Sequence, residues 1–402
     1  MTGTRSLLAA NPSFRLWLAS DVVRTLGFAV STVVLPILVY ERTGSPVQTG
    51  LLAALRVVPY LAVGLLAGAI ADRVDRKRLL IATTVVEGLA MATIPLVDAV
   101  TPVPLIQIYL VTLIGSTAFV FADAAAFGAL PTIVGPDRLA SANGTLLAAV
   151  SAAMIGGPAI GSLLVATIGA APAIWVDVGG FALGALLLMG VRGEFCEPRT
   201  STTLRAHAVA GLRFVVSDRT LCVLLVAGFA QSLAIGAVAG QLVVFAVEGL
   251  DIPEIDARVG WLFSAGSVGP LLAGVVFGRL FDVGRVRLLT PAALLAGAGS
   301  LALLAAAGGI WVAAVGYLLF GLATQVAINT GITYRQLVSP PGLRSSVNVI
   351  GRMVAWGGNP FGAMVAGFVA AAAGVRTAFW AGVVVLAVTA LVAALTIPRK
   401  RP

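Results

Sequence analysis

The stretch Gly68-Ala69-Ile70-Ala71-Asp72-Arg73-Val74-Asp75-Arg76-Lys77-Arg78 follows a long apolar segment and ends in a basic cluster. A weaker copy, Gly278-Arg279-Leu280-Phe281-Asp282-Val283-Gly284-Arg285-Val286-Arg287, stands 210 positions later. In each stretch a small residue permits two helices to approach, and an Asp marks the point where the apolar segment ends. Together the two stretches predict helix ends on one side of a membrane and a duplication within the chain.

The composition predicts an all-α integral membrane protein. Of the 402 residues, 59% are hydrophobic and 11% are charged, and the mean hydropathy is +1.02. Soluble proteins have about 45–50% apolar and ~25% charged residues. About twelve apolar stretches, from Phe14–Tyr40 to Ala378–Ile397, are long enough to cross a bilayer as helices and too long for barrel strands. We expect no cleavable signal, because Met1–Asn11 is short and polar and the first apolar segment is too long.

The halves of the chain resemble each other, which predicts two pseudo-symmetric six-helix bundles. Corresponding residues such as Pro158 and Pro360 are separated by 202 positions, close to the shift between the two opening stretches. Parallel six-helix halves are a recurring transporter architecture. The expected domains are an N-terminal bundle over 1–192, a cytoplasmic linker over 193–218 and a C-terminal bundle over 219–402.

The basic residues predict the orientation. Most of the 26 Lys and Arg fall in the termini and the even-numbered loops, whereas the other side has only Arg42, Arg258 and Arg376. By the positive-inside rule both termini are cytoplasmic and the chain lies in the cell (inner or plasma) membrane. Within the linker, Leu204–Val216 has an apolar face and predicts a short helix on the membrane surface. The net charge of +9 reflects this bias, so no nucleic-acid partner is expected.

Other classes of membrane protein fit less well. Two Cys and one His are too few for a disulfide framework or a metal site, and no cofactor is expected. A channel needs a filter loop, a nucleotide-driven pump needs a phosphate loop, and a membrane enzyme needs a catalytic acid or His set. A transporter, not an enzyme, is predicted. Its expected partners are the lipid bilayer, a small-molecule substrate and protons, and it is expected to act as a monomer.

Further motifs point to a known family. They are Asn11-Pro12-Ser13-Phe14, Thr43-Gly44-Ser45, Arg56-Val57-Val58-Pro59 and Leu139-Ala140-Ser141-Ala142-Asn143-Gly144. With the opening stretch, they make the chain resemble the major facilitator superfamily over nearly its whole length. The resemblance is to the branch of macrolide, multidrug and siderophore exporters. It implies the twelve-helix fold of that family and transport by alternating access.

The opening stretch is expected to form a cytoplasmic gate. An anion at the end of the second span can face a helix N-terminus, which the resemblance assigns to the eleventh span near Ser345. Arg73 is expected to pair with Asp123, while Arg76, Lys77 and Arg78 set topology and contact anionic headgroups. The alternative is that the whole cluster is only a topology signal. The expected gate residues are Gly68, Asp72, Arg73, Arg76, Lys77, Asp123, Gly278 and Asp282.

The fifth span contains a partial antiporter motif, Gly156-Gly157-Pro158-Ala159-Ile160-Gly161. The resemblance implies that this motif kinks the helix and packs it against the eighth span, which has its own Gly269-Pro270. Ala153 and Ser162 stand where the fuller pattern has Gly. Ordinary close packing is the alternative for Gly156, Gly157, Pro158, Gly161, Gly269 and Pro270.

Charged residues inside the spans are candidates for proton coupling. Asp21, Arg24, Arg56 and Glu87 lie at similar depths in the first three spans and are expected to form one buried cluster. Burial favours the neutral form of a carboxyl and a nearby Arg favours the ionised form, so proton affinity can change with conformation. Glu87 and Asp21 are the expected carriers. The alternative is a static salt bridge between Asp21 and Arg24, and Asp177 is expected to cap or gate.

The substrate is expected to be a moderately large amphipathic organic molecule. Candidate cavity residues are Phe28, Tyr60, Phe229, Gln231, Asn329, Arg352, Trp356 and Asn359. The prediction is therefore a proton antiporter that exports a drug, antibiotic, siderophore or other secondary metabolite. The alternatives are proton-coupled uptake of a small organic solute and, less favoured, a membrane subunit of another transport system.

Overall fold

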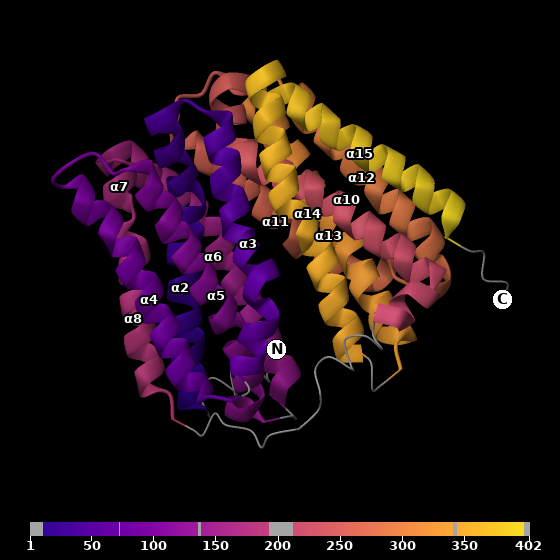
Figure 1. Cartoon of the computed structure of the whole chain (residues 1–402), viewed down its shortest axis with the longest axis horizontal. Coiled ribbons are helices and arrows are strands. Elements are labelled where there is room, and N and C mark those ends of the chain that lie inside the picture. Colours follow the sequence, from indigo (N-terminus) through magenta and orange to yellow (C-terminus); the bar gives the residue numbers. More distant parts are fainter. Residues whose placement is uncertain (1–10, 72, 136–137, 193–211, 341–343, 398–402) are drawn as a thin grey trace. The chain divides into compact units, whose positions relative to one another are not determined.

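The computed structural model describes residues 11–71, 73–135, 138–192, 212–340 and 344–397. This part of the chain is helical and has no strand, as Figure 1 shows. Twelve of its helical segments are long and apolar enough to cross a membrane. The predicted all-α, twelve-span architecture is confirmed. Asp72, His207 and most of the predicted surface helix lie outside the described residues, and only residues 212–217 of the linker are seen as helix.

The helices follow the chain in an order that repeats. The first half contains α2 (Pro12–Thr43), α3 (Pro46–Ala71), α4 (Arg76–Asp98), α5 (Leu105–Val134), α6 (Leu139–Ile168), α7 (Ala170–Ala173) and α8 (Trp175–Gly190). The second half contains α10 (Arg219–Val244), the π-helix η2 (Phe245–Gly249), α11 (Arg258–Leu280), the 3₁₀ helix η3 (Val283–Arg285), α12 (Val286–Ala306), α13 (Ile310–Val338), α14 (Arg344–Ala373) and α15 (Val375–Thr396).

The chain divides into two compact units that differ from the predicted halves in two places. Unit 1 comprises 1–42, 58–200 and 254–264, and unit 2 comprises 43–57, 201–253 and 265–402. The first part of α3 therefore belongs to unit 2, and the start of α11 belongs to unit 1. Glycines explain the first exchange: a Cβ at Gly50 would lie 2.5 Å from Ala363 O, so α3 begins directly against α14.

Both units repeat one packing pattern, which can be followed in Figure 1. In unit 1, α4 lies beside α5 and α8, and in unit 2, α12 lies beside α13 and α15. The interior of unit 1 at one end is an apolar cluster that includes Phe14, Trp17 and Leu80. Burial of such side chains contributes about 25 cal/mol per Å² of apolar surface removed from water.

Glycines bring the helices of each unit into close contact. In unit 1, Cβ atoms at Gly157 and Gly180 would overlap Ala29 and approach Val23 O to 2.6 Å, so α6 and α8 both pack directly on α2. In unit 2, a Cβ at Gly236 or Gly358 would overlap the facing backbone, so α10 and α14 are equally close. Small residues are the usual means of helix association in membranes, where apolar burial adds little between helices.

Arg376 joins three helix ends within unit 2 by hydrogen bonds. Arg376, in the first turn of α15, donates from Nη1 to Ala305 O at 2.6 Å and from Nη2 to Gly249 O at 2.6 Å and Ala307 O at 2.7 Å. Its guanidinium also lies 5.6 Å from the Phe245 ring centre. A cation is favoured at a helix C-terminus because the last carbonyls lack partners within the helix. Arg376 thus joins the ends of α12 and η2 to the start of α15.

Candidate functional site

Asp75, the second Asp of the opening stretch, lies at the start of α4. The Asp75 carboxylate accepts hydrogen bonds from Lys77 N at 2.8 Å and Arg78 N at 3.1 Å. It is therefore the N-cap of α4, a role that stabilises a helix by about 1 kcal/mol. The signal in the sequence is an Asp directly before a helical run.

The basic cluster makes protein contacts. Lys77 Nζ donates to Met189 O at 2.9 Å and to Val191 O at 2.7 Å, at the C-terminus of α8. Arg76 is 6% exposed, whereas Arg78 is exposed. Of the three side chains expected to face headgroups, Arg76 and Lys77 are instead held within unit 1. The start of α4 and the end of α8 are therefore joined by an ammonium group.

Other contacts expected of the gate are not formed within the units. Arg73 and Asp123 are both exposed and make no ion pair with each other. Within its own unit, a Cβ at Gly68 or Gly278 would meet no atom within 4 Å, so the close approach of helices there stays a prediction. Asp282 is exposed and accepts a hydrogen bond from Gly284 N at 2.8 Å, which shapes a local turn.

Three of the four expected coupling residues lie in unit 1. Arg24, on α2, is within electrostatic range of Asp21 on the same helix and of Glu87 on α4. No ion pair within 4.0 Å joins Asp21 to Arg24, so the static salt bridge considered as an alternative is not formed. Arg56 belongs to the part of α3 in unit 2. The cluster within unit 1 is therefore Asp21, Arg24 and Glu87.

Glu87 is the most enclosed member of this cluster. It is 4% exposed, and its Oε1 is buried and accepts no hydrogen bond from the described residues. Arg24 Nε is also buried without an acceptor among them. The Arg24 side chain crosses α8 at Gly184, where a Cβ would lie 2.5 Å from Arg24 Cγ. Glycine at 184 thus gives the cation its path between the helices.

Asp177 joins this cluster, and sequence reasoning missed its place there. It is 0% exposed, lies in the first turn of α8, and accepts a short hydrogen bond from Ser31 Oγ. A Cβ at Gly27 would lie 2.6 Å from Asp177 Oδ1, so glycine is needed for the carboxylate to reach α2. Asp177 is within electrostatic range of Glu87. The spacing of Gly27 and Ser31, one turn apart on α2, was the signal available.

The motif of the fifth span packs mainly on the first span. Gly157 and Gly161 face α2, where a Cβ at Gly161 would lie 3.0 Å from Val30 O. Gly156 has no neighbour within 4 Å of an added Cβ. In the eighth span, Gly269 and Pro270 contact α13, since a Cβ at Gly269 would lie 2.5 Å from Leu322 N. Most of the motif therefore provides close packing with helices other than those expected.

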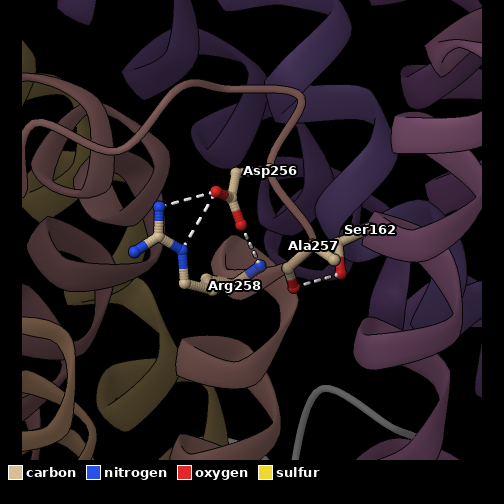
Figure 2. A network of polar contacts seen from close by, with 4 residues as sticks. All are labelled: Ser162, Asp256, Ala257 and Arg258. Atoms are coloured by element: carbon tan, nitrogen blue, oxygen red, sulfur yellow. Dashed lines mark hydrogen bonds and ion pairs between the residues drawn. The ribbon is translucent and has the colours of Figure 1, made fainter.

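The predicted contact between the fifth and eighth spans does exist at one end. Ser162 Oγ donates to Ala257 O at 2.8 Å (Figure 2). A Cβ at Gly260 would overlap Pro158 O. Asp256 accepts from Arg258 N at 2.8 Å and from Arg258 Nη2 at 2.7 Å, and this hydrogen bonding lowers the pKa of the Asp256 carboxyl. Ser162, which departs from the antiporter pattern, is thus the residue that makes the contact.

The expected cavity residues differ in burial. Gln231 is 2% exposed and donates from Nε2 to Thr324 O at 2.5 Å, so it links α10 to α13. The backbones of Phe229 and Asn359 pack against Gly358 and Gly236, while both residues are half-buried. The other candidates are half-buried or exposed: Phe28, Tyr60, Asn329, Arg352 and Trp356.

Two of these residues already have polar or aromatic neighbours. Phe28 stacks on Phe119, with ring centres 6.0 Å apart. Asn329 Oδ1 accepts a hydrogen bond from Gln325 Nε2 at 2.8 Å, which leaves its amide nitrogen as a possible donor. Trp356 is 45% exposed. An apolar lining with a few polar groups is typical of sites for organic molecules.

Sequence comparisons match the chain to one family and to named relatives. The family model described as Major Facilitator Superfamily matches residues 18–257 and 249–402. The multidrug efflux pump Tap of Mycobacterium tuberculosis (strain ATCC 25618 / H37Rv) is 30% identical over 222 residues, and the chain spans about half of that relative, 52%. Tap of Mycolicibacterium fortuitum is 27% identical over 385 residues, 88% of each chain. The enterobactin exporter EntS of Escherichia coli O9:H4 (strain HS) is 25% identical, covering 85% of this chain and 82% of EntS.

Solved structures share the fold at low identity. A bacterial homolog of the human lysosomal transporter Spinster, inward-facing and unoccupied, has a TM-score of 0.77 at 16% identity, covering 96% of this chain and 97% of the homolog. A mutant of the nucleoside transporter NupG has a TM-score of 0.80 at 13% identity, covering 95% and 100%. The resemblance expected from the opening stretch is confirmed. The chain belongs to the Major Facilitator Superfamily, and the part that the structure describes has twelve helices long and apolar enough to cross a membrane.

Proposed function

We propose that this transporter exports amphipathic organic compounds in exchange for protons, by alternating access and as a monomer with both termini in the cytoplasm. The relatives that are named efflux pumps and exporters support the direction. The distribution of Lys and Arg supports the orientation. The observation that carries proton coupling is the buried group of Glu87, Asp177 and Arg24 in unit 1.

The charges of this group favour a bound proton. Glu87 and Asp177 share their surroundings with Arg24, which Asp21 also faces. Burying a net negative charge in a membrane is costly, and three carboxylates would outnumber the one cation, so protonation of Glu87 lowers that cost. Glu87 Oε1, which has no donor among the described residues, is the open acceptor for that proton.

Proton exchange then follows from a movement of the Arg24 side chain between Glu87 and Asp21. When Arg24 approaches Glu87, the ionised carboxylate is favoured and the proton leaves; when Arg24 turns towards Asp21, Glu87 binds a proton again. Arg24 lies within electrostatic range of both carboxylates, so a small movement of one side chain alters the balance. If the proton is bound from outside and released inside, each cycle supplies energy for export.

The gate remains part of this proposal. Asp72 and Arg73 are proposed to hold the inward side closed, as the sequence indicates. Lys77, bonded to the end of α8, supports the motif from within unit 1. The half-buried and exposed cavity candidates, Phe28, Tyr60, Asn329, Arg352 and Trp356, are proposed to contact the substrate.

Inverted membrane vesicles test the proposal. An imposed proton gradient, acidic inside, should drive accumulation of a fluorescent lipophilic cation, and addition of that cation should dissipate the gradient. Glu87→Gln keeps the side-chain shape but removes the titratable group, so exchange should fall more than tenfold while the protein remains in the membrane. Arg285→Gln, an exposed change in unit 2, is the control.

Two results would contradict the proposal. If Glu87→Gln exchanges at the wild-type rate, Glu87 does not couple protons to transport. If the gradient drives loss of substrate from inverted vesicles in place of accumulation, the transporter is an importer, which was the alternative from the sequence.

A further inference from the structure

Unit 2 contains an enclosed arginine near the end of a predicted span. Arg335 lies in the last turn of α13 and is only 5% exposed. A Cβ at Gly351 would lie 2.6 Å from both Cζ and Nε of Arg335. The guanidinium therefore lies flat against the backbone of α14, one residue before Arg352. Glycine at 351 is what makes room for it.

Arg335 has no counter-ion in the described structure. Its Nε is buried and donates to no acceptor among the described residues, and none of the described acids of unit 2 forms an ion pair with it. The charge within electrostatic range is Arg352, of the same sign. The C-terminal dipole of α13 favours a cation, but it supplies no acceptor for Nε.

A buried arginine whose Nε lacks an acceptor is costly, and a second arginine nearby adds to the cost. Oxyanions relieve both costs, because a guanidinium binds a carboxylate or phosphate through two parallel hydrogen bonds. The open Nε of Arg335 lies on the edge of the guanidinium that makes such a pair. The site is thus suited to a group with two or more anionic oxygens.

We infer that Arg335, Gly351 and Arg352 form a binding site for the oxyanion of an organic molecule or lipid, such as a carboxylate or phosphate. This inference rests on the proposed function, because it assigns an anionic group to part of the transported compounds. The same chemistry has a second source, the headgroup of an anionic phospholipid. The two sources require separate arms of one experiment.

The experiment measures thermal unfolding of the full chain in nanodiscs. In the first arm, phosphatidylcholine discs receive sodium phosphate or sodium benzoate at constant ionic strength, with sodium chloride as reference. In the second arm, discs contain phosphatidylglycerol and no added oxyanion. A ligand that binds only the folded state raises the unfolding temperature, so an occupied site shifts it by several degrees.

Three variants locate the response. Arg335→Gln should lose more than half of the shift, and Gly351→Ala should do the same by displacing the guanidinium. Arg335→Lys keeps the charge without the paired donors and should retain part of the shift. Arg285→Gln removes an exposed charge of the same unit and should respond like the wild type.

The outcomes separate the sources and the role. A shift with phosphate or benzoate supports a soluble organic anion, and a shift with phosphatidylglycerol alone supports a lipid headgroup. Without anion, Arg335→Gln should be at least as stable as the wild type, because it removes a cation that lacks an acceptor. The inference is overturned if no oxyanion shifts the wild type or if Arg335→Gln responds fully. Glu87→Gln should keep the rise in unfolding temperature with an oxyanion even where proton exchange is lost. Failure of the anion site and failure of proton coupling can therefore be told apart.

Discussion

In unit 1, α6 packs on α2 at Gly157, and in unit 2, α14 packs on α10 at Gly358. These are the first and fifth spans of each half, and glycine has the same part in both. The polar residues beside them differ. Unit 1 buries Glu87 and Asp177 close to Arg24, whereas unit 2 buries Gln231 and Gln241. The backbone packing was kept through the duplication while the ionisable groups were not.

The difference between carboxylates and amides indicates a division of tasks. Gln231 Nε2 donates a hydrogen bond to Thr324 O, and Gln241 Nε2 donates one to Pro46 O at 2.9 Å, so each amide joins two helices. An amide binds no proton between pH 4 and 10, whereas a carboxylate beside a cation changes its protonation with its neighbours. Unit 1 is thus suited to proton exchange and unit 2 to a fixed frame that carries the anion site.

Paired glycine substitutions test the shared packing and should have the largest effect. Gly157→Ala and Gly358→Ala each force a methyl group into a facing helix, so each should destabilise the protein by about 1–3 kcal/mol. Their neighbours Gly156 and Gly357 are matched controls, because a Cβ there meets nothing closer than 3.8 Å. Alanine at these controls should be neutral or stabilise by up to about 1 kcal/mol. Thermal unfolding in detergent measures all four, and equal effects at neighbours would refute the shared packing.

Asp177→Asn tests the difference in chemistry. Asparagine keeps an acceptor for Ser31 but removes a negative charge near Glu87, so protonation of Glu87 is less favoured. Exchange should fall about tenfold, equivalent to about 1.4 kcal/mol. Gradient-driven uptake into inverted vesicles measures the rate. The comparison fails if Gln231→Leu in unit 2 reduces exchange by as much as Asp177→Asn at equal protein level.

Asp256→Ala tests the hydrogen bonds that the Asp256 carboxylate accepts from Arg258 at the start of α11. Loss of these hydrogen bonds should cost about 1 kcal/mol at pH 7. Pairing with Arg258 lowers the Asp256 pKa below the ordinary value of 3.8, so its contribution is present above that pH and lost as the pH falls through the lower, folded-state pKa. Unfolding temperatures of the variant and the wild type should differ at pH 7 and converge as the pH falls through the lowered pKa. A constant difference would contradict the pairing.

Gln231→Leu should have the smallest effect. Hydrogen bonds between membrane helices contribute about 0.6 kcal/mol on average, and this variant removes one between α10 and α13. Stability should fall by about that amount, as measured by unfolding in detergent, while proton exchange remains at the wild-type rate. A loss of exchange without loss of stability would return Gln231 to the substrate path.

The fold could be predicted because membrane spans depend on composition and length. The positions of individual glycines were predicted, but not their partners. Gly157 faces Ala29, and that neighbour depends on how three-dimensional packing rotates each helix. Glu87 was predicted as buried from its place in an apolar segment. The burial of Asp177 and Arg335 was not predicted, because each lies near a helix end where sequence alone cannot separate a buried side chain from an exposed one.

The hydrogen bonds of Lys77 have a consequence for how the protein is made. Lys77 is a positive charge that helps set the orientation of the early spans as they enter the membrane. Its acceptors, Met189 O and Val191 O, are 112 and 114 residues later in the chain. During synthesis the Lys77 ammonium group therefore cannot form these two hydrogen bonds until α8 has been made. Folding of the start of α4 therefore depends on α8. A chain truncated before Met189 would lack both acceptors of the Lys77 ammonium group.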